Sequence, residues 1–294
     1  MLDTFLNELD RQDRSKNTIN AYKTDIKQFQ TWLLDTLGHE TNNITETDVR
    51  EYRQYLNVIK KLSVTSINRK LKSVVRYQNY LNDIGESKNR VETKDVLQKN
   101  NIEQEHEVKI VEKNDLYKLK RTIEADGNKR DIAVYYLLFG TGARVSELVN
   151  VELDDIHLTE RNGKNNYSYI LIRNGKGNKS RKIPLSQDVT KAIKDYLKVR
   201  RTTQSKKLLI GQRGAFTRLA VNKLLEKYSR QAQLEYVVTP HMARHTVFTM
   251  MIKNGTDVKT VQQLAGHSSS DVTYKFYVAS TTEDKQKAID DLRI

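Results

Sequence analysis

Cysteine is absent from this chain of 294 residues, which excludes a disulfide framework and every metal site built on thiolates. The six histidines stand in unrelated contexts and show no metal-ligand spacing. The sequence also lacks a long apolar stretch, a signal peptide and a glycine-rich nucleotide loop. We therefore expect no metal, no cofactor and no membrane association, and we expect the chain to reside in the cytoplasm.

Acidic residues are outnumbered, because 51 Lys and Arg face 37 Asp and Glu, with a net charge of +14 and a pI near 9.6. This positive potential can hold a polyanion by releasing its counterions, so nucleic acid is the predicted partner. A basic protein at a membrane surface is the alternative, and no insertion signal supports it. Hydrophobic residues make up 37%, and their periodic positions can bury two small cores rather than one large one.

The first part of the chain, residues 1–85, has the pattern of helices joined by short polar turns. Ser15 can cap a helix, and Thr45 with Asp48 resembles a capping box. A third long helix is predicted to end before Gly85. Apolar residues recur at three- and four-residue intervals and give each helix a buried face. In the first helix these residues are Ile19, Tyr22, Ile26, Phe29 and Leu33.

The third helix also carries a basic stripe. Arg69, Lys72 and Arg76 are spaced three and then four residues apart, so they align along one side and can track a phosphate strand. An ordinary solvated basic face is the alternative. Residues 86–107 lack apolar periodicity and mix charges of both signs, which indicates a linker to a second domain at residues 108–294.

An apolar run at residues 131–139 of the second domain predicts a buried helix. Gly140 and Gly142 then break or tighten the backbone where Arg144 appears, and Glu147 follows one helical turn later. An arginine beside a helix start can point its guanidinium donors into a pocket, whereas most arginines are surface residues.

Two strands follow this region. Residues 167–173 and 180–185 alternate polar and apolar side chains around a tip at residues 174–178, which is typical of a hairpin. Lys176 lies in this tip. A lysine in a turn usually serves solubility, but on a tip that reaches a DNA groove its ammonium group can protonate a leaving oxygen.

The next motif is a helix start rich in hydrogen-bond donors. Thr239 is a good N-cap and Pro240 suits the first helical position, so His241 falls in the first turn with Arg244 one turn further on. Free amides at a helix start already attract phosphate, and the imidazole and guanidinium add two more kinds of donor. His245 precedes apolar residues and is interpreted as a packed structural histidine.

A further short helix is predicted to end at Gly266, and His267 follows where its imidazole can turn toward the same anion. Together these stretches supply cations and hydrogen-bond donors. That inventory suits the neutralisation and protonation of a phosphodiester under in-line attack. We interpret the chain as one that acts on a nucleic-acid backbone.

The order and spacing of these motifs resemble the tyrosine recombinases, also called the phage integrase family. The likeness is to the two-domain type that includes the Xer recombinases and the resolvases or integrases of mobile elements. The matching residues are Arg144 with Glu147, Lys176, His241 with Arg244, and Leu264 to His267. The resemblance implies a mainly α fold with a small β-sheet, in which a helical core-binding domain and a catalytic domain form a C-shaped DNA clamp.

The resemblance also implies a chemistry. A tyrosine hydroxyl cleaves one DNA strand, forms a 3′-phosphotyrosyl bond and frees a 5′-hydroxyl, which attacks the partner duplex without ATP or metal. Arg144 and Arg244 would clamp the non-bridging oxygens of the scissile phosphate.

The remaining motif residues take supporting roles under the same resemblance. His267 would hydrogen-bond the phosphate, and Lys176 would be the general acid. His241 would assist proton transfer from the nucleophile, and Glu147 would orient the neighbouring cations.

One position departs from the family pattern. The nucleophilic tyrosine is expected nine residues after His267, where this chain has Phe276, and a phenyl ring cannot attack phosphorus. Tyr277 lies about 100° further round a helix, and Tyr274 is two residues too early. Three interpretations stay open: the tyrosine was replaced deliberately to trap uncleaved DNA complexes, Tyr277 is the nucleophile, or the chain is a naturally inactive binder.

The end of the chain predicts a last helix at about residues 282–292, with too little apolar surface to stand by itself. In relatives such a helix docks into the next protomer of a cyclic tetramer on two DNA sites, and docking on its own domain is the alternative. The expected partners are therefore double-stranded DNA with inverted-repeat half-sites, on the bacterial nucleoid, and further copies of this chain.

Two other functions compete with recombination. A non-catalytic DNA-binding or architectural protein could keep the same fold, but it would not need a lysine acid and a paired histidine. A type IB topoisomerase shares the chemistry but would not need a terminal docking helix.

Overall fold

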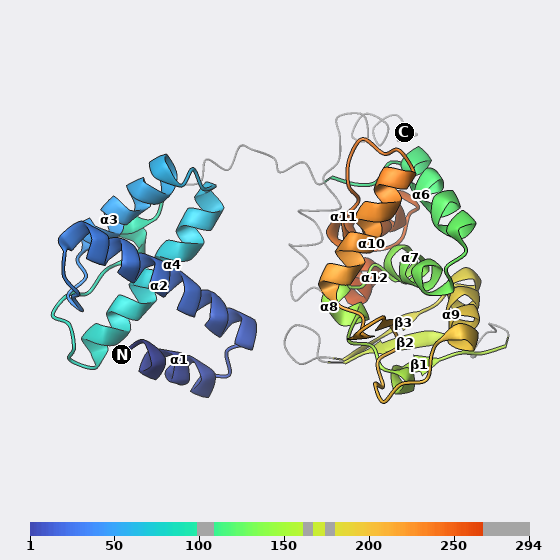
Figure 1. Ribbon diagram of the computed structural model, residues 1–294, viewed down its shortest axis with the longest axis horizontal. Coiled ribbons are helices and arrows are strands. Elements are labelled where there is room, and N and C mark those ends of the chain that lie inside the picture. The colour runs from blue at the N-terminus through green and yellow to red at the C-terminus, as the bar shows by residue number, and fades with distance from the viewer. Residues whose placement is uncertain (99–108, 161–166, 174–179, 267–294) are drawn as a thin grey trace, which may run out of the picture. The chain divides into compact units, whose positions relative to one another are not determined.

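The computed structural model describes residues 1–98, 109–160, 167–173 and 180–266. The chain divides into two compact units, residues 1–105 and 106–294 (Figure 1). Both units are mainly helical, and the second adds small antiparallel sheets, which confirms the predicted fold class. Among the helices of the described ranges, none is long and apolar enough to cross a membrane.

The first unit is a set of helices with locally encoded ends. Its helices are α1 (Leu2–Arg11), α2 (Lys16–Leu37), α3 (Glu46–Gln54), the π-helix η1 (Tyr55–Ile59), α4 (Val64–Asp83) and α5 (Thr93–Val96). The Ser15 side chain accepts a hydrogen bond from the backbone N–H of Thr18, and Thr45 and Asp48 form the predicted capping box. The chain leaves α4 through Gly85, whose φ of +79° favours glycine.

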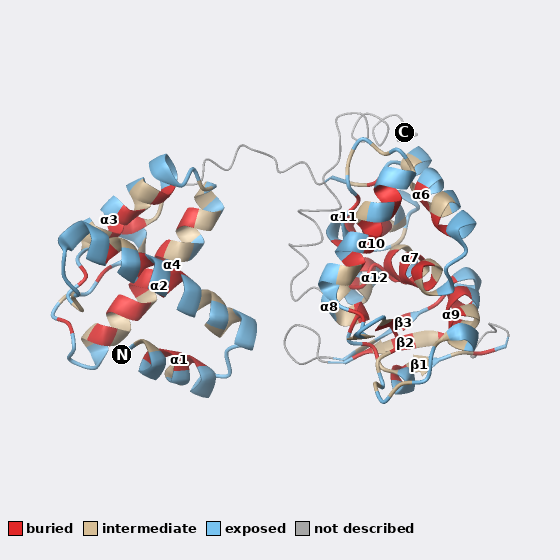
Figure 2. Cartoon of the chain, in the orientation of Figure 1, coloured by how far each residue is buried: buried red, intermediate tan, exposed pale blue. Residues whose placement is uncertain are grey.

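The core of the first unit lies between the inward faces of α1, α2, α3 and α4, which are coloured red in Figure 2. Aromatic rings take a large part in it: Phe5 meets Tyr77 edge to face at 5.4 Å between centroids, and Phe29 meets Tyr52 at 5.0 Å. Edge-to-face pairs contribute about 1 kcal/mol each beyond the burial of their area. Tyrosine and phenylalanine therefore stabilise this small core together with its aliphatic side chains.

The segment from residue 86 to residue 98, which the sequence assigned to a linker, packs on the first unit. Val91 and Val96 are buried, and α5 forms within this segment. Asn79 of α4 donates a hydrogen bond to the carbonyl of Val91 and accepts one from its N–H, each at 3.0 Å. Two isolated valines give no periodic signal, and side-chain amides of α4 replace the hydrogen bonds that regular structure would provide.

The second unit combines helices with two small sheets. Its helices are α6 (Lys113–Asp126), α7 (Lys129–Thr141), α8 (Val145–Leu148), the 3-10 helix η2 (Leu153–Asp155), α9 (Gln187–Val199), α10 (Arg218–Gln231), α11 (Pro240–Lys253) and α12 (Val258–Ala265). Its strands are β1 (Ile156–His157), β2 (Tyr169–Ile172), β3 (Arg181–Pro184), β4 (Ile210–Gly211) and β5 (Gly214–Ala215).

The larger sheet has the strand order β1-β2-β3 and is antiparallel throughout. Ile170 pairs with Ile183, and Ile172 pairs with Arg181, which confirms the predicted hairpin. The hairpin tip with Lys176 lies outside the described residues. β1 was not predicted, because two residues are too few to show an alternating pattern.

Helix α7 is the buried helix that the apolar run predicted, and it packs against both α9 and α11. A methyl group at Gly140 would come within 2.3 Å of the Val189 side chain on α9. At Gly142 a methyl group would lie 2.8 Å from the ring of Phe248 on α11, and its φ of +61° also favours glycine. The two glycines therefore allow α7 to approach both helices closely and bring the start of α8 beside α11.

Candidate active site

Arg144 is the N-cap of α8, two residues after the left-handed turn at Gly142. Its backbone N–H donates to Oε2 of Glu147 at 2.8 Å, and its Nη1 donates to Oε1 at 3.0 Å. The carboxylate thus holds both the turn and the guanidinium of the same residue. The sequence placed these two residues one turn apart, and the structure brings them into direct contact.

Arg244 reaches the same region from α11. Thr239 caps this helix by accepting a hydrogen bond from the N–H of Met242, and Pro240 is its first residue, as predicted. The Arg244 side chain is buried and donates from Nη1 to the carbonyl of Gly142 and from Nη2 to the carbonyl of Ala265, both at 2.7 Å. Its position is therefore fixed by the ends of two other helices.

The carboxyl end of α12 receives two further guanidinium groups. Arg144 lies 3.4 Å from both the Ala265 and the Gly266 carbonyl oxygens. Arg181, at the start of β3, donates from Nε to the Leu264 carbonyl at 2.9 Å. Helix ends expose unpaired carbonyls and carry partial negative charge, so these cations satisfy and stabilise this one. Three arginines from α8, β3 and α11 thus converge on one helix terminus.

Arg181 was not singled out from the sequence. It forms a two-pronged ion pair with Glu147, with Nη1 to Oε1 at 3.0 Å and Nη2 to Oε2 at 2.8 Å. The one signal in the sequence was the place of Arg181 in the predicted strand 180–185, where alternation puts it on the same face as the apolar Ile183 and Leu185. Its partner lies 34 residues earlier in the chain, so only the folded structure reveals the pair.

The cluster is electrostatically unbalanced toward positive charge. Glu147 is the carboxylate that contacts Arg144 and Arg181, and its side chain is only 8% exposed. Burial by itself raises the pKa of this carboxyl, but the hydrogen bonds and charges of Arg181 and Arg144 outweigh that effect and lower it overall. Glu147 is therefore ionised at neutral pH, and three guanidinium groups against this carboxylate leave the cluster able to attract an anion.

Two imidazoles face each other on α11. Nε2 of His241 lies 2.7 Å from Nε2 of His245, and the ring planes meet at 88°. One of these nitrogens must therefore carry a hydrogen while the other accepts it. His245 is buried, as predicted for a packed histidine, but its contact with His241 was not foreseen. Desolvation and the charge of Arg244 lower the pKa of His241, so its ring is neutral at pH 7 and can take up a proton.

The structure brings together Arg144, Glu147 and Arg244, with His241 one turn before Arg244 on α11. Lys176, His267, Phe276 and Tyr277 lie outside the described residues, as does the predicted last helix at residues 282–292. His267 directly follows Gly266, the residue whose carbonyl Arg144 approaches.

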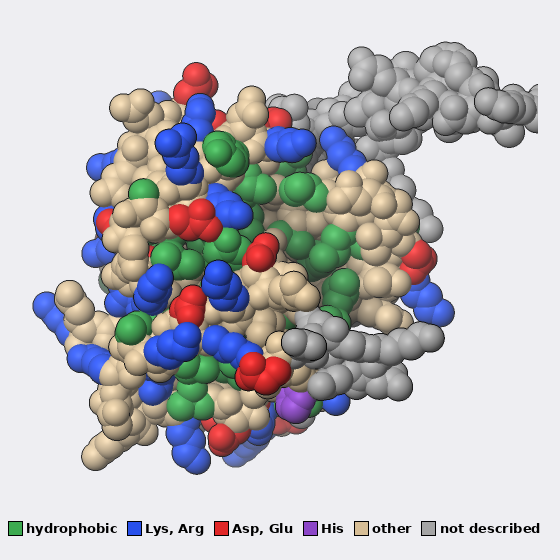
Figure 3. Space-filling model, turned by 90° about the vertical axis from the view of Figure 1, so that its right-hand side faces the viewer, with side chains coloured by type: hydrophobic (Ala, Val, Ile, Leu, Met, Phe, Trp, Pro, Cys, Tyr) green, Lys and Arg blue, Asp and Glu red, His purple; other side chains and the backbone are tan. Residues whose placement is uncertain are grey.

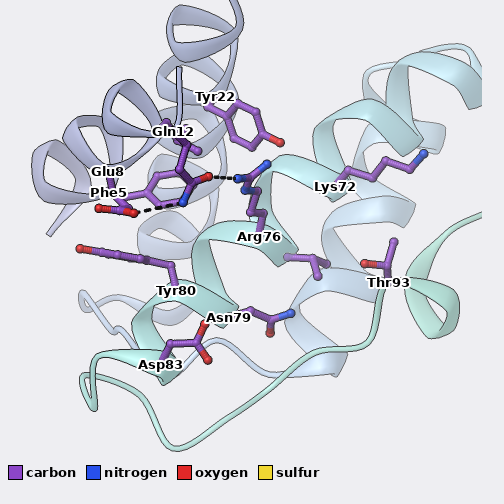
Figure 4. A pocket seen from close by; sticks show the side chains of 12 residues that line it. Phe5, Glu8, Gln12, Tyr22, Lys72, Arg76, Asn79, Tyr80, Asp83 and Thr93 are labelled. Atoms are coloured by element: carbon purple, nitrogen blue, oxygen red, sulfur yellow. Dashed lines mark hydrogen bonds between the residues drawn. The ribbon is translucent and has the colours of Figure 1, made fainter. Parts of the chain in front are cut away.

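In the basic stripe of α4, Arg69 and Arg76 bind other side chains of the first unit, whereas Lys72 is exposed to solvent. Arg69 pairs with both oxygens of the buried Asp25. Arg76 donates to Oε1 of Gln12 at 2.7 Å and lies over the ring of Tyr22. Figure 4 shows Arg76 pointing to Gln12 while Lys72 points away from it, on the wall of a depression of about 530 Å³ between α1, α2 and α4. Lys72 is exposed and forms no ion pair with any described residue.

The positive charge is not confined to these groups. The face in Figure 3 carries Lys and Arg side chains at many places, with acidic side chains interspersed. Such a distribution favours a polyanion over a single small anion, because the attraction is summed over many contacts.

Family comparisons agree with this architecture. Residues 109–284 match the model of the phage integrase family, and residues 2–98 match its N-terminal SAM-like domain. The chain is 30% identical to the TnP I resolvase of Bacillus thuringiensis, covering 96% of each chain. It is 33% identical to the tyrosine recombinase XerC of Listeria welshimeri, covering 95% of this chain and 92% of that one.

Solved structures show the same fold. The XerH site-specific recombinase bound to palindromic difH substrate aligns with a TM-score of 0.74 and 21% identity, covering 94% of this chain and 79% of that one. The Tn1549 transposon integrase in complex with transposon right end DNA aligns with a TM-score of 0.72 and 21% identity, covering 100% and 99%. The chain belongs to the phage integrase family of tyrosine recombinases. Its activity is accordingly that of a site-specific DNA recombinase, as the ordered motifs predicted.

Proposed function

We propose that the arginine cluster at the end of α12 is the site where this recombinase holds the scissile phosphate. The observation that carries this proposal is the approach of Arg144 and Arg244 to a common carbonyl, that of Ala265. These arginines lie 100 residues apart in sequence, and they come together immediately before His267. Two guanidinium groups fixed at one place before DNA arrives suit the charge that builds on a phosphate under attack.

The placement of Arg144, Arg244 and His241 supports their proposed roles, and the family chemistry alone supports those of His267 and Lys176. Arg144 and Arg244 hold the non-bridging oxygens, and His267 donates a hydrogen bond to the same phosphate. His241, neutral at pH 7, takes the proton of the attacking hydroxyl, while Lys176 protonates the leaving 5′-oxygen. The covalent 3′-phosphotyrosyl link keeps the energy of the broken bond for rejoining.

The nucleophile occupies the segment of Phe276 and Tyr277. Either Tyr277 attacks after a local change of helix register, or Phe276 stands in place of the tyrosine and the chain binds DNA without cutting it. The second alternative leaves a non-catalytic DNA-binding protein, and Phe276 is the observation that favours it.

We further propose that the two units grip one DNA duplex as a clamp and that four copies assemble on two sites. Each site would contain inverted-repeat half-sites, and residues 282–292 would dock on a neighbouring protomer. The XerH recombinase and the Tn1549 integrase were both solved in complex with DNA, which supports the DNA part. Such a protein would work on chromosomal or plasmid DNA at the nucleoid.

The test begins with the DNA that this chain binds in cells, whose sequence identifies the cognate site. A nicked version of that site is mixed with the present chain, with Phe276→Tyr and with Tyr277→Phe, and detergent-resistant protein–DNA adducts are measured. An adduct that Tyr277→Phe abolishes assigns Tyr277 as the nucleophile, whereas an adduct that requires Phe276→Tyr assigns position 276. If none of the three chains forms an adduct, the catalytic proposal fails and the binder remains. Supercoil relaxation without recombination would instead indicate a topoisomerase.

A further inference from the structure

We propose that Arg181 is a positioning residue of this site, which keeps Arg144 available to the phosphate by occupying the carboxylate of Glu147. This inference rests on the proposed function of the arginine cluster. Arg181 does not touch the phosphate in this scheme. It acts through Glu147 and through the end of α12.

The geometry of the carboxylate carries the first step. Both oxygens of Glu147 accept from Arg181, and each also accepts one hydrogen bond from Arg144, one from the backbone and one from the guanidinium. A buried carboxylate has about four acceptor sites, so Glu147 is filled. Arg144 can therefore bind it with one prong only, through Nη1.

The donors that remain on Arg144 give the second step. Within the described part of the chain its Nε–H makes no hydrogen bond, and its Nη2 makes only the 3.4 Å contact with the Gly266 carbonyl. These donors can turn to an incoming anion at low cost. Without Arg181, one acceptor position on each oxygen of Glu147 would become free. The guanidinium of Arg144 could then pair with both oxygens in the two-pronged geometry that carboxylates favour.

A third contact ties Arg181 to the helix end. Its side chain is only 14% exposed and donates to the Leu264 carbonyl. A methyl group on Gly266 would lie 2.9 Å from Nη1 of Arg181, and the φ of Gly266 is +62°. Arg181 thus packs against the turn that leads out of α12 and fixes Glu147 and that turn to the same strand.

The variant Arg181→Met removes the guanidinium and keeps the side-chain length. In the chain that forms the adduct, we expect its single-turnover cleavage rate to fall about 30- to 100-fold, with affinity for the cognate DNA within about threefold, because a misplaced group impairs the reacting geometry. Arg181→Lys should recover part of the rate, since it restores the charge but not the two-pronged pair. Lys182→Met, one residue further along β3, is the matched control. Lys182 lies over the ring of Tyr169, so its replacement should leave the cleavage rate unchanged.

A double-mutant cycle separates positioning from general stability. In a Glu147→Gln background, Arg181→Met should lower the rate by less than about threefold, because the competing carboxylate is already gone. Equal losses with and without Glu147 would overturn the inference while leaving the proposed function standing. The crystal structure of Arg181→Met gives a readout without cleavage: the guanidinium of Arg144, which now donates to Oε1 alone, should donate to both oxygens of Glu147. An unchanged position of Arg144 in that structure would refute this inference. The absence of an adduct from every chain would instead refute the proposed function, so the two failures can be told apart.

Discussion

Arg144 and Arg244 point their guanidinium groups at the same acceptor, the carbonyl oxygen of Ala265, at 3.4 and 2.7 Å. Like charges are seldom brought this close unless an anion or a partial negative charge lies between them. Here the carboxyl end of α12 supplies that charge. The fold itself therefore assembles the site, and little reorganisation is needed when a phosphate binds.

The first prediction concerns the shape of these two cations. Arg144→Lys and Arg244→Lys keep the charge but lose the planar fork, so each should lower the cleavage rate about 10²- to 10³-fold. Affinity for DNA, measured by gel shift at fixed salt, should change less than about tenfold. Arg201→Lys is the control, because Arg201 also binds backbone carbonyls, those of Gly211 and Gln212. A loss of the same size in this control would contradict a specific role.

The second prediction is a pH dependence set by His241. An unfolded histidine titrates near pH 6.5, and the folded pKa of His241 lies lower because of desolvation and the charge of Arg244. The folded state therefore binds this proton less tightly, and the stabilising contribution is complete above pH 6.5 and is lost as the pH falls below it.

Cleavage should decline over the same acidic range, because a protonated ring cannot accept the proton of the nucleophile. The measurement is an NMR titration of the His241 ring, with His241→Gln to assign its signal and to flatten the acidic limb of the rate profile. A midpoint at or above pH 6.5 would contradict the prediction.

The third prediction compares two glycines in the left-handed conformation. Gly255 has a φ of +81°, and no described atom lies within 4 Å of the position that a methyl group would take, so Gly255→Ala should lower the free energy of unfolding by about 1 kcal/mol through backbone strain alone. Gly266→Ala adds a collision with Arg181 and should lower it further. Only the second variant should also slow cleavage. If Gly255→Ala and Gly266→Ala lower the free energy of unfolding in urea equally, and change the cleavage rate equally, the contact of Gly266 with Arg181 is unimportant.

The fourth prediction separates the members of the α4 stripe. Lys72 is exposed, so Lys72→Gln should weaken binding to DNA of any sequence and leave the melting temperature of the protein unchanged. The slope of the logarithm of the binding constant against the logarithm of the salt concentration should fall in magnitude by about one. Arg69→Gln should in addition lower the free energy of unfolding by about 1 kcal/mol, because it removes hydrogen bonds to the buried Asp25. A stability loss in Lys72→Gln, or none in Arg69→Gln, would reverse this assignment.

The features that the sequence revealed are those encoded within a few residues. Ser15, the Thr45–Asp48 box and Thr239 with Pro240 define helix starts through contacts three residues apart, and all are found where they were predicted. The hairpin was visible because strands alternate with a period of two. Local patterns of this kind were sufficient for the fold class and for the family.

The features that the sequence did not reveal depend on distant partners. The pair of Arg181 and Glu147 joins a strand to a helix formed 34 residues earlier, and no spacing rule connects them. Asn79 anchors residues 86–98, which resemble a linker when only composition is considered. The contact between His241 and His245 is local in sequence, and His245 was predicted to be buried, but a spacing of four residues does not by itself show that the two rings touch.

The close approach at Gly140 extends the site's requirements into a region that carries none of its chemistry. Val189 stands where a methyl group at position 140 would go, and α9 begins only a few residues after β3, the strand that carries Arg181. A side chain at Gly140 would push α9 away from α7 and, through the short connection from β3 to α9, displace β3. Gly140 lies inside an apolar helix and takes no part in the chemistry. Its replacement by a larger residue would nevertheless lower the cleavage rate, because it would displace the strand that carries Arg181.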